Sequence, residues 1–204
     1  MIEDLRRQLR EKFPQAHAAA AMMAEEKPDP GQAFDPGFFP PGVISEVVGA
    51  GGGLLVAGLL GEPEEPAALP DFILVDGGDH FDPASFTQEA CSRLVWVRCL
   101  NAGEMLRATD ALVRDGNIPF LLLDTCGIGR RELRGIPASA WWRLKLAAAT
   151  ANCRLVVMSP FAQVSCAGVR LALNAKLGLE DFELPRCELI ARLRVVPERM
   201  KKIH

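Results

Sequence analysis

The chain has 204 residues, of which 49% are hydrophobic and 24% are charged, and its formal net charge is −3. This length and composition are typical of one globular domain with an appendage, and they exclude a disordered chain. The small negative charge excludes a protein that binds polyanions over its whole surface, although a local basic patch is still allowed. The apolar runs are too short to span a bilayer, and the charged start MIEDLRRQLREK is unlike a signal peptide, so no membrane contact is expected.

Cysteine and histidine usage argues against a metal centre. Six cysteines are scattered without a C-x-x-C pair, and three histidines lie far apart in the sequence. Several cysteines adjoin predicted strands, where a free thiol behaves as a small hydrophobic group. We therefore expect a reducing, cytoplasmic location and neither a metal nor another cofactor.

Residues 1–26 are predicted to form an N-terminal helical arm. Leu5 and Leu9 recur at helical spacing, and an alanine-rich stretch with high helix propensity follows. An isolated helix of this length is marginal in water, so the arm should dock on its own domain or on another chain. Self-association through this arm is one of the expected outcomes.

Residues 27–42 are rich in proline and glycine and are predicted to be an extended linker. Phe34, Phe38 and Phe39 lie in this segment, and exposed aromatic rings need a pocket. Two alternatives remain open from the sequence: the rings either pack back on the domain or fill a groove of a partner protein.

The stretch VISEVVGAGGGLLVAGLL, residues 43–60, predicts a strand, a glycine-rich turn and a helix. The glycines are Gly49, Gly51, Gly52 and Gly53. In this context, backbone N–H groups at a helix N-terminus often hold phosphate groups. The usual motif continues with Lys and Ser or Thr, which neutralise phosphate charge and bind Mg²⁺, but here Leu54 and Leu55 follow. We therefore interpret the stretch as a vestigial nucleotide loop and favour a packing turn over productive ATP binding.

Residues 43–204 are expected to form the core domain, with an acidic spacer at 61–70. The patterns predict further strands and helices that alternate along the chain, and Asn101 with Glu104 should cap the helix that ends at Gly116. Met105, Ala108 and Leu112 should line the inner face of that helix. Since the strands are apolar on both faces, we expect an α/β fold with a mostly parallel sheet covered by helices. The predicted strands are 72–76, 94–99, 118–124, 154–158, 174–179 and 187–196, and the other helices are 83–92, 138–151 and 166–173.

Four segments in this order resemble the core of RecA-type recombinases: VISEVVG, ILVDGGDHFDPASF, NAGEMLRATDALVRDGNIPFLLLDT and SCAGVRLALNAKLGLE. The resemblance covers residues 43–196 and implies a RecA-like, P-loop-type core. Within that group, LRRQLRE, GEMLRATDALVRDG and WWRLKLAAATANCRLVVMSP with AGVRLAL are most similar to the ImuA/SulA-type accessory proteins of the bacterial DNA-damage (SOS) response. That likeness implies a role in translesion synthesis beside a Y-family-like polymerase or a recombinase.

The resemblance also carries two acidic positions to this chain. Asp124 matches the metal-associated aspartate of the family, with an ordinary strand-end carboxylate as the alternative. Asp79 falls, with a shift of one residue, where the family has its catalytic glutamate, but its side chain is one methylene shorter. Ser159 and Pro160 occupy the region of the family's nucleotide-sensing glutamine. With these parts altered, we expect a protein that is not an enzyme and has no catalytic residue.

The segment 126–137 matches the first DNA-contacting loop of recombinases and carries Arg130, Arg131 and Arg134. Clustered arginines suit phosphate contact with single-stranded DNA, although a run of charge is more often a solvated face or a contact for an acidic partner. The second such loop, 161–168, has no charged residue. Two rival functions remain: an ATP-dependent recombinase-like ATPase, and a SulA-like inhibitor of cell division.

Overall fold

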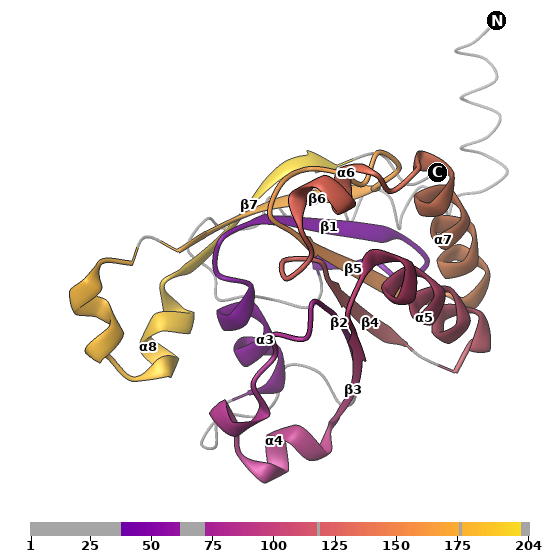
Figure 1. Ribbon diagram of the computed structural model, residues 1–204. Helices are drawn as coiled ribbons and strands as arrows, with labels where there is room; N and C mark the ends of the chain where they lie inside the picture. Colours follow the sequence, from indigo (N-terminus) through magenta and orange to yellow (C-terminus); the bar gives the residue numbers. More distant parts are fainter. Residues whose placement is uncertain (1–37, 62–71, 118, 176, 201–204) are drawn as a thin grey trace, which may run out of the picture.

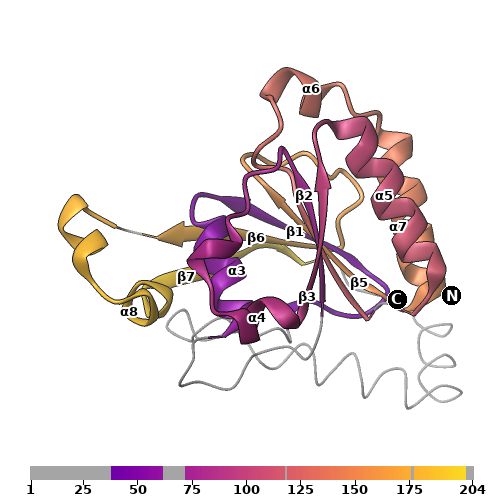
Figure 2. The same cartoon turned by 60° about the horizontal axis from the view of Figure 1, so that its bottom comes forward.

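The computed structural model describes residues 38–61, 72–117, 119–175 and 177–200. A twisted sheet lies between two layers of helices, as Figures 1 and 2 show. The expected arm, with Leu5 and Leu9, and the linker residue Phe34 lie outside the described residues.

The sheet has seven strands in the order β3-β2-β4-β5-β1-β6-β7. All neighbouring pairs are parallel except β6 and β7, which are antiparallel. This arrangement confirms the predicted α/β class with a mostly parallel sheet. The strand bounds are β1 (Ile44–Gly49), β2 (Phe72–Gly77), β3 (Leu94–Cys99), β4 (Phe120–Asp124), β5 (Arg154–Ser159), β6 (Val169–Ala175) and β7 (Leu193–Met200).

Helices α5 and α7 pack on one face of the sheet, and α3 packs on the other. The expected cap of α5 is confirmed, because the Asn101 side chain accepts a hydrogen bond from the Glu104 amide at 2.9 Å and Gly116 ends the helix with φ +78°. The helices are α3 (Gly52–Leu60), α4 (Gln88–Ser92), α5 (Ala102–Asp115), α6 (Arg130–Arg134), α7 (Ala138–Ala151) and α8 (Arg186–Ala191), and the 3₁₀ turns are η2 (Pro83–Ser85) and η3 (Leu179–Glu183).

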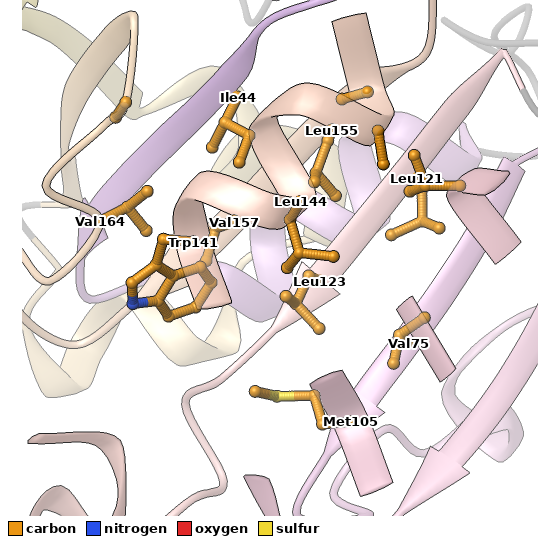
Figure 3. Packing of buried hydrophobic residues seen from close by; sticks show 14 of the residues in the cluster. Ile44, Val75, Met105, Leu121, Leu123, Trp141, Leu144, Leu155, Val157 and Val164 are labelled. Carbon is orange, nitrogen blue, oxygen red and sulfur yellow. The ribbon is translucent and has the colours of Figure 1, made fainter. Parts of the chain in front are cut away.

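Alternate residues of the central strands supply two apolar cores. On one face, Trp141 and Leu144 of α7 and Met105 of α5 contact the sheet (Figure 3). On the other face, α3 packs through Leu55 and Leu59. Burial of both faces explains why the strands read as continuous apolar runs. The buried strand residues of the first core include Ile44, Val75, Leu121, Leu123, Leu155 and Val157.

The predicted inner face of α5 is confirmed at Met105 and is displaced by one residue at its other two positions. Met105, Thr109 and Val113 are buried, whereas Ala108 and Leu112 are only partly buried beside them. Thr109 tolerates burial because its hydroxyl donates to the Met105 carbonyl at 2.8 Å. The helix therefore meets the sheet through an i, i+4, i+8 row that includes one polar residue.

The predicted helix at 166–173 is wrong. Strand β6 begins at Val169 and pairs with β1, and the Gly168 amide donates to the Ile44 carbonyl at 2.9 Å. Val169, Leu171 and Leu173 are buried in alternation, which is the period of a strand. The predicted strands 174–179 and 187–196 shift accordingly, since 186–191 is helix α8 and β7 follows it.

The structure also corrects the predictions for two short segments. The expected helix 83–92 is divided into η2 and α4, because Thr87 caps a new helix by accepting from the Ala90 amide at 3.1 Å. The segment 126–137, expected to be a loop, contains the helical turn α6.

Phe38 and Phe39 pack on this domain, which is the first of the two alternatives that the sequence left open. Phe39 is 1% exposed, lies edge-on to the Phe120 ring at 6.1 Å, and its carbonyl accepts from Arg154 Nε at 2.9 Å. Phe38 is partly buried against the same core. The end of the predicted linker is therefore part of the packed domain.

Candidate functional site

The residues that the sequence singled out gather at the carboxyl ends of the parallel strands. Gly49 ends β1, Asp124 ends β4, and Asp79 follows β2. In open α/β sheets, this edge is where ligands usually bind.

The glycine turn after β1 is short. Strand β1 ends at Gly49 and helix α3 begins at Gly52, so Ala50 and Gly51 alone connect them. The phosphate-cradling motif places four residues between its two glycines. Here the Leu55 amide already donates to the Gly51 carbonyl at 3.0 Å, so the chain enters the helix at once. Counted between glycines, Gly49 and Gly53 enclose three residues, one fewer than in that motif.

Gly49 is required by close packing. Its φ is +130°, and a Cβ placed there would lie 2.3 Å from the Leu173 carbonyl oxygen on β6. Gly51 also has a positive φ, +104°. These conformations suit glycine because it has no Cβ. The glycines thus allow the chain to turn sharply from β1 into α3, at the point where β1 lies close to β6.

The two leucines after the turn belong to the core. Leu55 is fully buried among the residues of the α3 face, and Leu54 is partly buried against them. They stand where a nucleotide loop has its cation and its metal-binding hydroxyl. This geometry favours the interpretation as a packing turn.

A buried acidic pair lies at the same edge of the sheet, where strand β5 separates it from the glycine turn. The sheet register places Asp76 opposite Asp124, and the imidazole of His80 lies between them. His80 Nδ1 is 3.2 Å from Asp76 Oδ1, and His80 Nε2 is 3.4 Å from Asp124 Oδ2. Burial raises the pKa of Asp124, and the hydrogen bond from the Cys126 amide opposes that rise. Asp124 is therefore held in a local network rather than open to solvent.

Asp76 was missed by sequence reasoning. It is fully buried, and its Oδ2 accepts from the Phe81 amide at 2.9 Å and from Trp96 Nε1 at 3.1 Å. The available signal was its place at the end of an apolar strand, the same place that Asp124 has in β4. Within the described part of the chain, no group of three or more His, Cys, Asp and Glu side chains is arranged to hold a metal ion.

Asp79, which the resemblance placed near the family's catalytic glutamate, lies outside the acidic pair. It sits in a turn with φ +52°, and its carboxylate forms a two-pronged pair with Arg98 of β3, at 2.5 and 2.6 Å. The hydrogen bonds from Arg98 lower the pKa of Asp79. The neighbour His80, and not Asp79, faces Asp124.

The segment 160–168 is held against strand β1 by the carboxylate of a buried ion pair. Glu46 of β1 is fully buried, and its Oε2 lies 2.7 Å from Arg170 Nε on β6. Its Oε1 accepts from the amides of Gln163 and Val164 at 2.7 and 2.9 Å. A buried carboxylate is tolerated when it is paired and hydrogen-bonded in this way. The sequence signal was an acidic residue in the middle of an apolar strand.

Gln163 joins this segment to the ends of β4 and β5. Its Nε2 donates to Thr125 Oγ1 at 3.0 Å and to Ser159 Oγ at 2.9 Å. Sequence reasoning placed Ser159 in the region of the family's glutamine and missed that Gln163 contacts it. The Gln163 Oε1 atom is buried without a hydrogen-bond partner among the described residues.

The structure brings together the two segments expected to face DNA. The guanidinium carbons of Arg130 and Arg134 on α6 lie 5.0 and 5.7 Å from the ring centre of Phe161. Arg131 is exposed on the same helical turn. We call Arg130, Arg131, Arg134 and Phe161 the arginine surface. Helix α6 is itself held by Glu132, whose Oε1 accepts from the Ala102 amide at 2.6 Å.

The comparisons with known proteins assign no family. A scan of the chain against models of protein families finds no match, and a search of curated proteins finds no significant similarity. Among the described residues, each helix is too short or too polar to cross a membrane.

Proposed function

We propose that this protein is a non-catalytic accessory protein with a RecA-like core, which acts through macromolecular contacts in the bacterial DNA-damage (SOS) response. The observation that carries the proposal is the glycine turn, in which Leu54 and the buried Leu55 stand where a nucleotide loop has its polar residues. The resemblance of four ordered segments to recombinases supports the cellular role, which is to assist translesion synthesis in the cytoplasm. Six free cysteines are consistent with that compartment.

The charge balance at the strand ends opposes phosphoryl transfer. Catalysis of that reaction rests on a cation and a metal ion placed around the γ-phosphate. At this edge of the sheet, the turn consists of glycine, alanine and leucine and has no cationic side chain. Asp76 and Asp124 are carboxylic acids, and the His80 imidazole lies between them. A triphosphate would therefore meet carboxylates without a cation from the turn.

The arginine surface is the proposed contact with single-stranded DNA. Exposed guanidinium groups bind phosphates without sequence preference, and an aromatic ring beside them offers a surface on which a base can stack. Arg130 and Arg134 already lie against Phe161, which holds the charged and aromatic groups together. The same charges suit an acidic surface of a Y-family-like polymerase or a recombinase, which is the proposed protein partner.

Fluorescence anisotropy with labelled oligothymidine at low salt tests the DNA contact. The variant R130A/R134A is compared with R192A/R194A, which removes the same number of charges from the region of α8 and β7. We expect the first variant to bind more than 10-fold more weakly, and the slope of log K against log[salt] to fall by about 1.4, which corresponds to two lost phosphate contacts. Equal binding by the two variants would contradict the DNA contact.

The rival functions are separated by two further measurements. DNA-stimulated release of phosphate from ATP would support the recombinase-like ATPase. Affinity capture from DNA-damaged cells should recover a polymerase or a recombinase, whereas recovery of a filament-forming division GTPase would support the SulA-like inhibitor.

A further inference from the structure

The segment that carries Phe161 is neither helix nor strand. Residues 160–168 connect β5 to β6, and Phe161 is partly buried against the core at the start of this connection. Buried backbone groups that lack the partners of a helix or a strand must find them in side chains. The side chains that bind this segment therefore decide where the Phe161 ring lies relative to Arg130 and Arg134.

The buried ion pair binds the backbone just after Phe161. Glu46 Oε1 accepts from the amides of Gln163 and Val164 at 2.7 and 2.9 Å. Glu46 Oε2 accepts from Arg170 Nε at 2.7 Å, and Arg170 Nη2 donates in turn to the Val164 carbonyl at 3.0 Å. Hydrogen bonds to charged groups are the strong ones. The pair thus fixes donors and an acceptor of the backbone two and three positions after the ring.

The Gln163 side chain adds a second connection, toward the arginines. Its Nε2 donates to Thr125 Oγ1 at 3.0 Å and to Ser159 Oγ at 2.9 Å. Thr125 follows β4 and leads into the segment 126–137, which contains α6. The segment that carries Phe161 and the segment that carries the arginines are therefore joined at the ends of β4 and β5.

The burial of Glu46 serves geometry more than stability. Glu46 is fully buried in β1, and an apolar side chain at this position would avoid the cost of removing a charge from water. Its hydrogen bonds go to Arg170 and to the segment 160–168, as given above, so what the carboxylate adds is the conformation of that segment.

We propose that Glu46 is a positioning residue for the contact with single-stranded DNA. Through the amides of Gln163 and Val164, it holds the Phe161 ring where a base stacks on it. The inference rests on the proposed DNA contact of the arginine surface. Because Glu46 is fully buried, it acts through Phe161 and not on the DNA itself. Its loss should therefore remove the stacking contribution and leave the phosphate contacts in place.

Glu46→Gln, which is neutral and of the same size, tests the proposal by fluorescence anisotropy. Labelled oligothymidine is compared with an oligomer of abasic sites of equal length, which has the phosphates and lacks the bases. E46Q and F161A should each bind oligothymidine about 5-fold more weakly or worse, the usual worth of one base–aromatic stack. The double variant E46Q/F161A should be no more than about 2-fold weaker than F161A, since both changes remove one interaction.

The abasic oligomer separates positioning from a general loss of structure. The wild type, E46Q and F161A should bind it within about 2-fold of one another, because phosphate contact does not need the ring. For the same reason, the slope of log K against log[salt] for oligothymidine should be the same for E46Q and the wild type.

Asp181→Asn is the matched control. Asp181 also pairs with an arginine, Arg192, and also accepts from a backbone amide, that of Gly178 at 2.7 Å. It lies in η3 beside α8, which both views place away from α6 (Figures 1 and 2). D181N should bind both oligomers as the wild type does. If E46Q loses the circular dichroism of the wild type, Q163A replaces it and should give the same pattern, since it removes the second connection and leaves the ion pair in place.

Wild-type affinity of E46Q for oligothymidine would overturn the proposal. An equal loss on both oligomers, or a loss that multiplies with that of F161A, would also overturn it, because the effect would then not pass through the ring. Failure of the proposed function looks different: R130A/R134A would bind oligothymidine as well as R192A/R194A does, and the positioning role would fall with it.

Discussion

Replacing Gly49 with alanine tests whether the glycine turn is a packing device. The new Cβ would lie 2.3 Å from the Leu173 carbonyl oxygen, and the residue would keep a φ of +130°. A side chain at a positive φ of this kind costs ~1–3 kcal/mol. Forcing an extra carbon into a packed site costs a further ~1–3 kcal/mol. G49A should therefore lower the free energy of unfolding by about 4 kcal/mol.

Gly53→Ala is the matched control in the same turn. Gly53 lies in the first turn of α3, and a Cβ there meets no other atom of the described residues within 4 Å. This variant should be more stable than the wild type by about 0.5–1 kcal/mol, because alanine loses less entropy on folding. Urea unfolding measures both effects, and at a slope of about 2 kcal/mol/M the midpoints of G49A and G53A should differ by roughly 2.4 M. A midpoint of G49A within 0.3 M of the wild type would refute the reasoning, since the close approach to β6 would then carry no cost.

Three further predictions use the same unfolding assay. L55A should cost about 2–5 kcal/mol because it opens a cavity in the core; a loss no larger than that of L54A would contradict the burial of Leu55. Burial raises the pKa of Asp124, so the folded chain keeps the Asp124 proton to a higher pH than the unfolded chain does. The stability that this proton contributes is present below about pH 4, and it is lost as the pH rises through the pKa of Asp124 in the folded chain. As the pH rises from 4 to 7, D124N should therefore become more stable relative to the wild type. A difference in free energy of unfolding that stays constant over this range would contradict the prediction. E46A should cost about 3–5 kcal/mol, because Arg170 keeps a buried charge without its partner; the amides of 160–168 should also exchange faster, and unchanged exchange there would exclude the proposed anchoring.

Local patterns in the sequence predicted the elements whose ends carry strong signals. Helix α5 lies between a capping Asn101 and a left-handed Gly116, and both signals act within a few residues. Helix α7 was predicted with its observed bounds, since Pro137 starts it and Trp141, Leu144 and Ala148 form one buried face. The parallel sheet followed from strands that are apolar on both faces.

Contacts between distant parts of the chain could not be predicted in this way. Strand β6 was misread as a helix, because its identity depends on pairing with β1, more than 120 positions earlier. Glu46 and Arg170 meet only through that pairing. The pairing of Asp76 with Asp124 requires β2 to lie beside β4, an order that the patterns of single strands do not contain.

We propose that the glycine turn packs a helix on the sheet and does not hold nucleotide. Isothermal titration calorimetry of the full-length protein with Mg·ATP tests it most directly, with G49A as a second sample and added oligothymidine as a second condition. We expect no saturable heat up to millimolar nucleotide under either condition. Saturable binding of one Mg·ATP per chain in the micromolar range would contradict it.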